Sequence, residues 1–191
     1  MAANKNMNTD SKNKYPSEDE CLILIEKYEM LPNIVKHSIQ VKNVAEAIYN
    51  HLTDKDKISI ELLVAAALLH DIAKTRSILQ NEMRHDLTGG EMLRELGLEE
   101  IAVIVENHVV FTGFDPDSPL NEIEIIYYAD KRVMHDKVVN IDTRVTDLVE
   151  RYGRTEKIKE MILHNKKFIL QLEDKIQRHM DINIETALKD L

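Results

Sequence analysis

Apolar residues recur at spacings of three and four along most of the chain, which is the period of an α-helix with one buried face. In residues 35–52, for example, Val41, Val44, Ala45 and Ile48 share one face. The pattern predicts helices over residues 18–30, 35–52, 59–75, 86–97, 98–109, 121–136, 142–153 and 155–180. No stretch alternates long enough to demand a β-sheet, so the sequence predicts an all-α fold.

The most apolar of these predicted helices, residues 59–75, carries His70 and Asp71 side by side near its end. Ser59 can cap its first turn. Burying a carboxylate is costly unless it is paired, hydrogen-bonded or bound to a metal. The rest of the sequence therefore has to supply a partner for Asp71.

Three segments make up the predicted organisation. Residues 1–16 are polar and predict a flexible tail, residues 17–140 form one helical domain, and residues 141–191 add C-terminal helices packed on that domain. The last long helix carries an apolar stripe that is either a packing face or a homodimer face: Ile158, Met161, Ile162, Ile169, Leu172 and Ile176.

Composition narrows the functional classes. Apolar residues make up 43% of the 191, which indicates a globular protein, and no apolar run is long enough for a membrane span. The 25 basic and 34 acidic residues give a net charge of −9, which disfavours general nucleic-acid binding. The single Cys21 excludes an internal disulfide, so we expect a cytoplasmic protein.

The eight histidines divide into two groups. Four lie in polar surroundings or point away from the apolar helices, and we assign them to the surface: His51, His135, His164 and His179. Asp130 lies within another apolar helix, where its charge needs a partner. The selection leaves six candidates for buried chemistry: His37, His70, Asp71, His85, His108 and Asp130.

The candidates stand in a specific order, in the segments KHSIQVKNVA, LLHDIAK, RHDLTGGEML, ENHV and YYADKR. Over residues 20–135 this order resembles the HD superfamily of metal-dependent phosphohydrolases, closest to short proteins with an HDIG-type domain. The resemblance implies a single HD-domain helical bundle with a C-terminal helical extension. Ala73 stands where the motif name has glycine. Residues 109–119 lack the His-His-Glu and Gly-Tyr-Pro signature of cyclic-di-GMP phosphodiesterases, which argues against that activity.

The resemblance also implies a ligand set. His37, His70, Asp71 and Asp130 would hold one metal, and His85 and His108 a second, with Asp71 bridging. Four imidazoles and two carboxylates suit one or two divalent transition metals, Fe, Mn, Zn, Co or Ni, better than Mg or Ca.

The expected activity is hydrolysis of a phosphoester or phosphoanhydride, of a nucleotide, by a metal-bound hydroxide. Two metals roughly 3.5–4 Å apart can share such a hydroxide and clamp a phosphoryl oxygen. The alternative is a metal-holding nucleotide sensor or binding module with little turnover. The partner in either case is a small anionic phosphorylated ligand.

Cations near the ligands are the candidates for binding such an anion. Lys74, three residues after Asp71 on the same predicted helix, is assigned to catalysis together with Asp71. Its ammonium either steadies Asp71 or meets charge on the phosphoryl oxygens. Four other cations are candidate substrate ligands: Lys36, Arg76, Lys131 and Arg132. Gly89 and Gly90 stand inside a helical pattern, which we interpret as close approach to the metal-binding helices.

Overall fold

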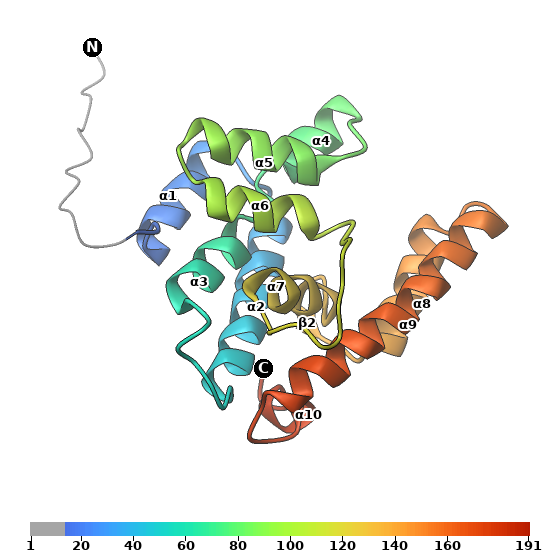
Figure 1. Ribbon diagram of the computed structural model, residues 1–191. Coiled ribbons are helices and arrows are strands. Elements are labelled where there is room, and N and C mark those ends of the chain that lie inside the picture. Colours follow the sequence, from blue (N-terminus) through green and yellow to red (C-terminus); the bar gives the residue numbers. More distant parts are fainter. Residues whose placement is uncertain (1–13) are drawn as a thin grey trace, which may run out of the picture.

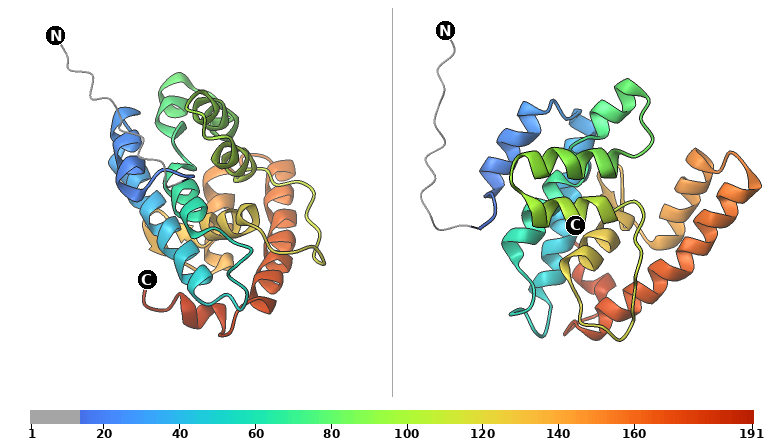
Figure 2. Two further views of the ribbon diagram at one scale, coloured as in Figure 1. Left: turned by 60° about the vertical axis from the view of Figure 1, so that its left-hand side comes forward. Right: turned by 45° about the horizontal axis from the view of Figure 1, so that its top comes forward.

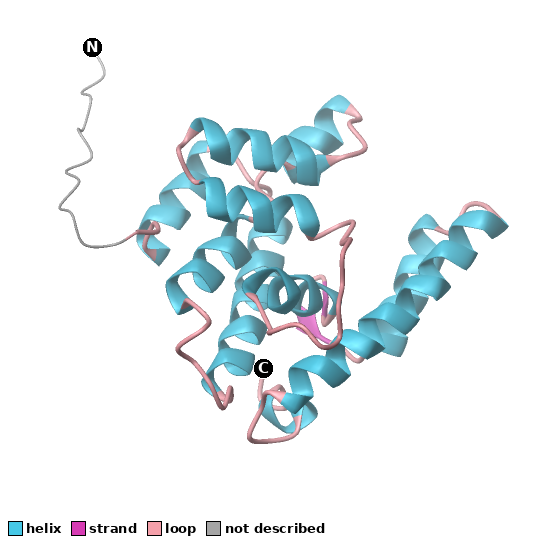
Figure 3. Ribbon diagram, viewed as in Figure 1, coloured by secondary structure: helices cyan, strands magenta, loops and turns pink. Residues whose placement is uncertain are grey.

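The computed structural model describes residues 14–191, so the predicted tail up to residue 13 lies outside the described residues. The helices are α1 (Glu18–Lys27), α2 (Pro32–Asn50), α3 (Ile60–Leu69), α4 (Lys74–Gln80), α5 (His85–Glu95), α6 (Glu99–Asn107), α7 (Glu122–Lys131), α8 (Ile141–Tyr152), α9 (Glu156–Arg178) and α10 (Ile184–Ala187). Two short strands, β1 (Val133–Met134) and β2 (Lys137–Val138), pair antiparallel. The all-α prediction is confirmed, as the helical ribbon of Figure 3 shows.

Helix α3 forms the centre of the bundle. Its apolar residues are almost all buried, and it packs against α1, α2, α6 and α7 (Figure 1). Burying so many apolar side chains on one short helix contributes much of the hydrophobic stabilisation of the domain. Because the residues that end α3 are part of this core, their backbone is held firmly in place.

The predicted helix over residues 59–75 is wrong in one respect, because it breaks after Leu69. Residues 70–73 form tight turns instead: the Ile72 amide donates to the Leu69 carbonyl oxygen at 3.0 Å, and the Lys74 amide to that of Asp71 at 2.9 Å. Helix α4 then starts at Lys74. The break puts His70 and Asp71 at the end of a buried helix, where both side chains can turn toward the same centre.

The predicted helix over residues 121–136 also ends early, at Lys131. A small hairpin follows, with β-branched Val133 and Val138 paired across it and His135 at its tip with φ of 59°. A left-handed backbone ends helical hydrogen bonding. The short helix α10 was not predicted, because four residues give too little periodicity to detect.

Helices α8 and α9 form a two-helix hairpin that extends from the bundle (Figures 1 and 2). The C-terminal half of α9 packs on the domain and buries Ile169, Leu172 and Ile176. At the distal half, Ile158 and Met161 are 37% and 62% exposed. The predicted stripe is thus a packing face in its C-terminal half, and its role as a homodimer face stays a prediction.

A buried ion pair fastens α9 to α7, and hydrogen bonds of the same lysine reach the loop before α7. The Lys175 ammonium donates to the Glu124 carboxylate at 2.7 Å, to the Asp115 carbonyl oxygen at 2.8 Å and to the Ser118 hydroxyl at 2.9 Å. Both charged side chains are almost fully buried. Among the described residues, no helix is long and apolar enough to cross a membrane.

Candidate metal centre

The six residues singled out by sequence lie together in the structure, although they come from distant parts of the chain. His37 is on α2, and His70 and Asp71 are in the turn after α3. His85 opens α5, His108 follows α6, and Asp130 is on α7. The packing of α2, α3, α6 and α7 around one core brings these positions together.

The Asp71 carboxylate lies at the middle of the cluster. One of its oxygens is 3.1 Å from His85 Nε2 and 3.4 Å from His108 Nε2. The other oxygen is 3.6 Å from His70 Nε2. Asp71 therefore faces three imidazoles, and its position between them agrees with the bridging role that the resemblance implies.

Asp130 forms the second centre of negative charge. Its Oδ1 is 2.9 Å from His37 Nε2 and 3.9 Å from His70 Nε2. Two groups of three side chains have ligand atoms within 4.8 Å of one another: His37, His70 and Asp130 form one, and His70, Asp71 and His108 form the other. Each group could hold a metal ion, and His70 belongs to both.

Backbone carbonyl groups fix the orientation of three imidazoles. Because a carbonyl oxygen can only accept, each Nδ1 carries the proton: that of His70 donates to Ala67 at 2.7 Å, that of His108 to Val105 at 2.6 Å, and that of His37 to the carbonyl oxygen of His135 at 2.9 Å. Each Nε2 then faces the cluster, where it can offer its lone pair to a metal. This arrangement is typical of metal-binding histidines.

His70 gives the test of whether a metal fits. Its side chain is fully buried, and its Nε2 has no hydrogen-bond partner among the described residues. The lone pair of that atom faces carboxylate oxygens of Asp71 and Asp130, which cannot donate a hydrogen bond when ionised. A buried arrangement of lone pairs is unfavourable unless a cation lies between them. The residues therefore fit a divalent transition metal.

The protonation states also suit metal binding. Burial lowers the pKa of His70 to about 3, so its imidazole is neutral. Burial alone would raise the pKa of Asp71 and of Asp130, but nearby positive charge, mainly Lys74 for Asp71 and Lys131 for Asp130, holds each pKa well below its ordinary value. Neutral imidazoles and ionised carboxylates are the forms that bind metals.

A large cleft of about 1200 Å³ opens over this cluster. Lys74 lines it, and its ammonium lies 3.2 Å and 3.3 Å from the two Asp71 oxygens. The predicted contact between these residues is present, although a turn rather than a shared helix produces it. Lys36 also lines the cleft and is exposed.

The remaining predicted substrate ligands have other positions. Lys131 lines the cleft, but its ammonium already donates to the Asp130 carboxylate at 2.6 Å and to the His108 carbonyl oxygen at 2.9 Å. The structure does not bring Arg76 or Arg132 to the cleft. Arg76 is exposed on α4 and pairs with Glu82 at 3.3 Å.

Arg132 is directed into the protein. Its guanidinium donates to the Tyr128 hydroxyl at 2.6 Å and to the Val139 carbonyl oxygen at 2.8 Å, and it pairs with Glu185 at 2.8 Å. These contacts occupy the donors of the guanidinium, and the pair with Glu185 links the end of α7 to α10. Arg132 therefore holds the fold together, and the expectation that it binds substrate has no support in its surroundings.

Gly89 lies where α5 approaches the metal-binding turn. A Cβ atom at Gly89 would be 3.1 Å from Val105, 3.5 Å from Ile72 and 3.7 Å from Ala73. Ile72 and Ala73 directly follow Asp71, so α5 packs on the turn that carries the central carboxylate. This contact agrees with our interpretation for Gly89, whereas a Cβ atom at Gly90 would meet the Glu106 side chain of α6.

Sequence reasoning missed one wall of the cleft. Residues of the α8–α9 hairpin line it, among them Arg144, Arg151, Tyr152 and Arg154. They lie beyond residues 20–135, where the motifs end, and the only signal in the sequence is the cationic and aromatic segment RYGR at residues 151–154.

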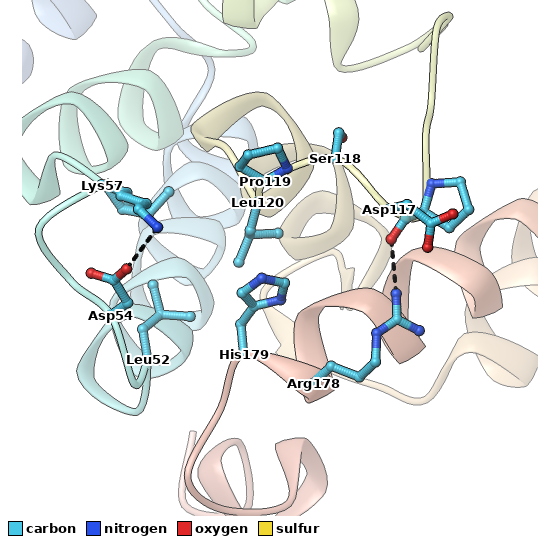
Figure 4. Close-up of a pocket in the computed structure, with 11 residues that line it drawn as sticks. Leu52, Asp54, Lys57, Asp117, Ser118, Pro119, Leu120, Arg178 and His179 are labelled. Atoms are coloured by element: carbon cyan, nitrogen blue, oxygen red, sulfur yellow. Dashed lines mark hydrogen bonds and ion pairs between the residues drawn. The ribbon is translucent and has the colours of Figure 1, made fainter.

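A second cavity of about 360 Å³ lies between the loop after α2, the loop before α7 and the end of α9. Figure 4 shows Leu52, Leu120 and His179 around it, with Arg178 at one side. Arg178 donates to the Pro116 carbonyl oxygen at 2.9 Å, and Lys57 pairs with Asp54 at 3.0 Å. This cavity shares no lining residue with the large cleft.

Comparisons with known proteins point to one family. A family model described as HD domain matches residues 34–135, a range that includes all six clustered residues. An uncharacterized protein of Methanocaldococcus jannaschii is 30% identical over 148 residues, which are 70% of this chain and 86% of that protein. No solved structure matches.

Two further relatives are named tRNA (cytidine(56)-2'-O)-methyltransferase. The one from Thermoplasma volcanium is 32% identical over 72% of this chain, and the one from Picrophilus torridus is 26% identical over 92%. The matched segments cover 42% and 52% of those proteins, so the chain spans about half of their length or less.

Proposed function

The chain belongs to the HD-domain superfamily of metal-dependent phosphohydrolases, and from this premise we propose that it hydrolyses a phosphoester or phosphoanhydride bond of a nucleotide. The observation that carries the proposal is the buried, unpartnered Nε2 of His70 facing two ionised carboxylates at the base of a large cleft. Such a centre is suited to holding metal ions next to a bound substrate.

Asp71 and Asp130 supply the negative charge that would hold the metals, and the four histidines complete the set. When bound, the metals supply Lewis-acid activation of water and of the phosphoryl oxygens. Asp71 stays ionised and lies between three imidazoles, so its position fixes the geometry of the centre. Lys131 holds Asp130 and the backbone of His108 in place, which is a positioning role.

Lys74 is the residue we assign to the phosphoryl group. Its side chain is 34% exposed and faces the cleft while its ammonium contacts Asp71. Three donor protons allow it to keep that contact and also bind a phosphoryl oxygen. A cation already in place needs no reorganisation when charge develops in the transition state.

The names of the methyltransferase relatives suggest a second activity, and the site favours hydrolysis over it. The match with the Picrophilus torridus relative covers 92% of this chain and therefore spans the positions of the histidine and carboxylate cluster. Buried histidines and carboxylates gathered on a cleft floor are suited to binding a metal, and methyl transfer does not require such a set. We therefore propose hydrolysis, and not methyl transfer, for this chain.

The test is hydrolysis of p-nitrophenyl phosphate and of a nucleotide panel by protein loaded with Mn²⁺, Fe²⁺ or Zn²⁺. We expect turnover that a chelator abolishes, that added metal restores, and that Asp71→Asn lacks. Metal-loaded, folded protein that binds nucleotides without turnover would instead support the sensor alternative. Methyl transfer from S-adenosylmethionine to tRNA by this chain, without phosphate release, would overturn the proposal.

A further inference from the structure

The α8–α9 hairpin forms the wall of the cleft that the family motifs do not cover, and it carries three arginines. We propose that this hairpin is a substrate-recognition arm in which Arg144, Arg151 and Arg154 bind a second anionic group of the substrate. The preferred substrates are then organic phosphates that carry a further phosphate besides the one hydrolysed. This inference rests on the proposed function, because it concerns the same cleft.

The charge around the cleft is the opposite of that of the whole chain. The lining includes six cationic residues, Lys36, Lys74, Lys131, Arg144, Arg151 and Arg154, against four acidic ones, Asp71, Glu82, Asp130 and Asp136. The complete chain has 34 acidic and 25 basic residues. Two of the four acids are candidate metal ligands, so bound metals would make the cleft still more positive. A cleft lined by one sign of charge concentrates ligands of the other sign.

The arm holds more cationic capacity than its own carboxylates use. Asp147 accepts from Arg144 at 2.9 Å and from Arg151 at 3.2 Å, so two guanidinium groups share one carboxylate. The Nε of Arg144 is buried and has no hydrogen-bond partner among the described residues. Among residues 14–191, which the structure describes, the Arg154 side chain makes no hydrogen bond or ion pair. These unused donors indicate that the arm binds an anion.

The arginines are arranged in a row that leads outward from the bundle. Ile141, at the start of α8, is buried against the domain, and Arg144 follows it by one turn. Arg151 lies two turns further along the same helix, about 10 Å at 1.5 Å per residue, and Arg154 comes just after its end. Such a row can contact an anionic group at a distance from the metal centre.

Apolar residues beside the row favour an organic ligand over an inorganic ion. Leu148, Ile158 and Ile162 line the same cleft, together with Tyr152, which is 49% exposed. The cleft volume of about 1200 Å³ is slightly above the range of roughly 300–1,000 Å³ that is typical of small-molecule sites, so the cleft has room for a nucleotide. A nucleotide with two or more phosphates would use both the cations and the apolar wall.

The experiment compares the binding of AMP and ADP to the full chain by calorimetry, in the presence of a chelator so that hydrolysis does not occur. For the unaltered protein we expect ADP to bind about 10-fold more tightly than AMP, since one charge-assisted contact is worth about that factor. The double variant Arg151→Ala/Arg154→Ala should lose this preference and keep its affinity for AMP. Arg178→Ala, which removes one arginine that lies outside the cleft, is the control for a general change of charge.

Kinetics of the metal-loaded protein separate this inference from the proposed function. With p-nitrophenyl phosphate, which has no second phosphate, the double variant should keep kcat, and with ADP its KM should rise about 10-fold or more. Equal binding of AMP and ADP by the unaltered protein, or an undiminished preference in the double variant, overturns the recognition arm while leaving hydrolysis intact. If a single-stranded RNA competes and ADP does not, the arm recognises a polymer and the inference is wrong. Absence of any hydrolysis overturns the proposed function alone.

Discussion

Replacing Lys74 with alanine tests the chemistry of the site most directly. The ammonium is placed at 3.2 Å from an Asp71 oxygen, and the side chain is 34% exposed toward the cleft. If the lysine only steadied Asp71, its loss would be a loss of one partly exposed ion pair. Such pairs contribute about 0–1 kcal/mol to the free energy of unfolding.

The two roles of Lys74 predict different magnitudes. Loss of a steadying ion pair would lower the melting temperature by at most about 2–4 °C in a protein of this size and leave kcat almost unchanged. Loss of a donor that acts in the transition state costs about 10²–10³-fold in kcat, or roughly 2.7–4 kcal/mol. We expect the second result, with metal content and melting temperature close to those of the unaltered protein.

The assay combines elemental analysis, calorimetry and steady-state kinetics on one preparation. Lys74→Arg should recover kcat poorly, because the planar guanidinium is larger and presents its donors differently. Arg76→Ala is a matched control: it removes a cation from the same helix α4, outside the cleft, and should keep full activity. Near-normal kcat in Lys74→Ala with intact metals would refute the reasoning and leave Lys74 as a steadying residue.

Two further predictions concern the metals and the core. The unaltered protein should bind up to two metals per chain. His70→Ala removes the imidazole common to both ligand groups, so it should lose both metals and melt about 11–22 °C lower when each metal is at 100 times its Kd. His85→Ala should lose activity but keep one metal, and equal metal loss in both variants would contradict a two-metal site. Lys175→Met leaves the Glu124 carboxylate buried without its partner and should cost about 3–5 kcal/mol in denaturant unfolding. Lys167→Met, on the exposed side of α9, should change stability little, and a similarly small effect of Lys175→Met would mean that water reaches the pair.

The sequence was sufficient to predict which six residues lie together, because several of them break the local pattern. Asp71 and Asp130 are charges inside strongly apolar helices, and such charges need partners. His37, His85 and His108 became candidates by their positions in the predicted helices, and the family resemblance supplied their order. The structure brings all five side chains, together with His70, around one centre.

Where helices end was less predictable, because tertiary contacts decide it. Apolar periodicity continues through residues 70–75, yet the chain turns there, and the turn lets His70 and Asp71 both face the cluster. The sequence pattern likewise predicts a helix beyond Lys131, but in the structure the helix ends there and His135 adopts a positive φ. The recognition arm was missed for a different reason. Its arginines face the cleft only because the hairpin folds back beside it, and helical periodicity within α8 and α9 carries no information on that packing.

The segment YYADKR shows why proximity in sequence is a poor guide to substrate contact. Its three charged residues are consecutive, and on a helix consecutive side chains point about 100° apart. Asp130 faces the histidines, Lys131 bends back onto Asp130 and the His108 carbonyl oxygen, and Arg132 points to the opposite side, toward Glu185. In this segment, the two cations that follow Asp130 therefore hold that carboxylate and the fold in place, and their donors are not free for substrate. Cations that are distant in sequence but face the open cleft, such as those of the α8–α9 hairpin, are better placed to bind the substrate.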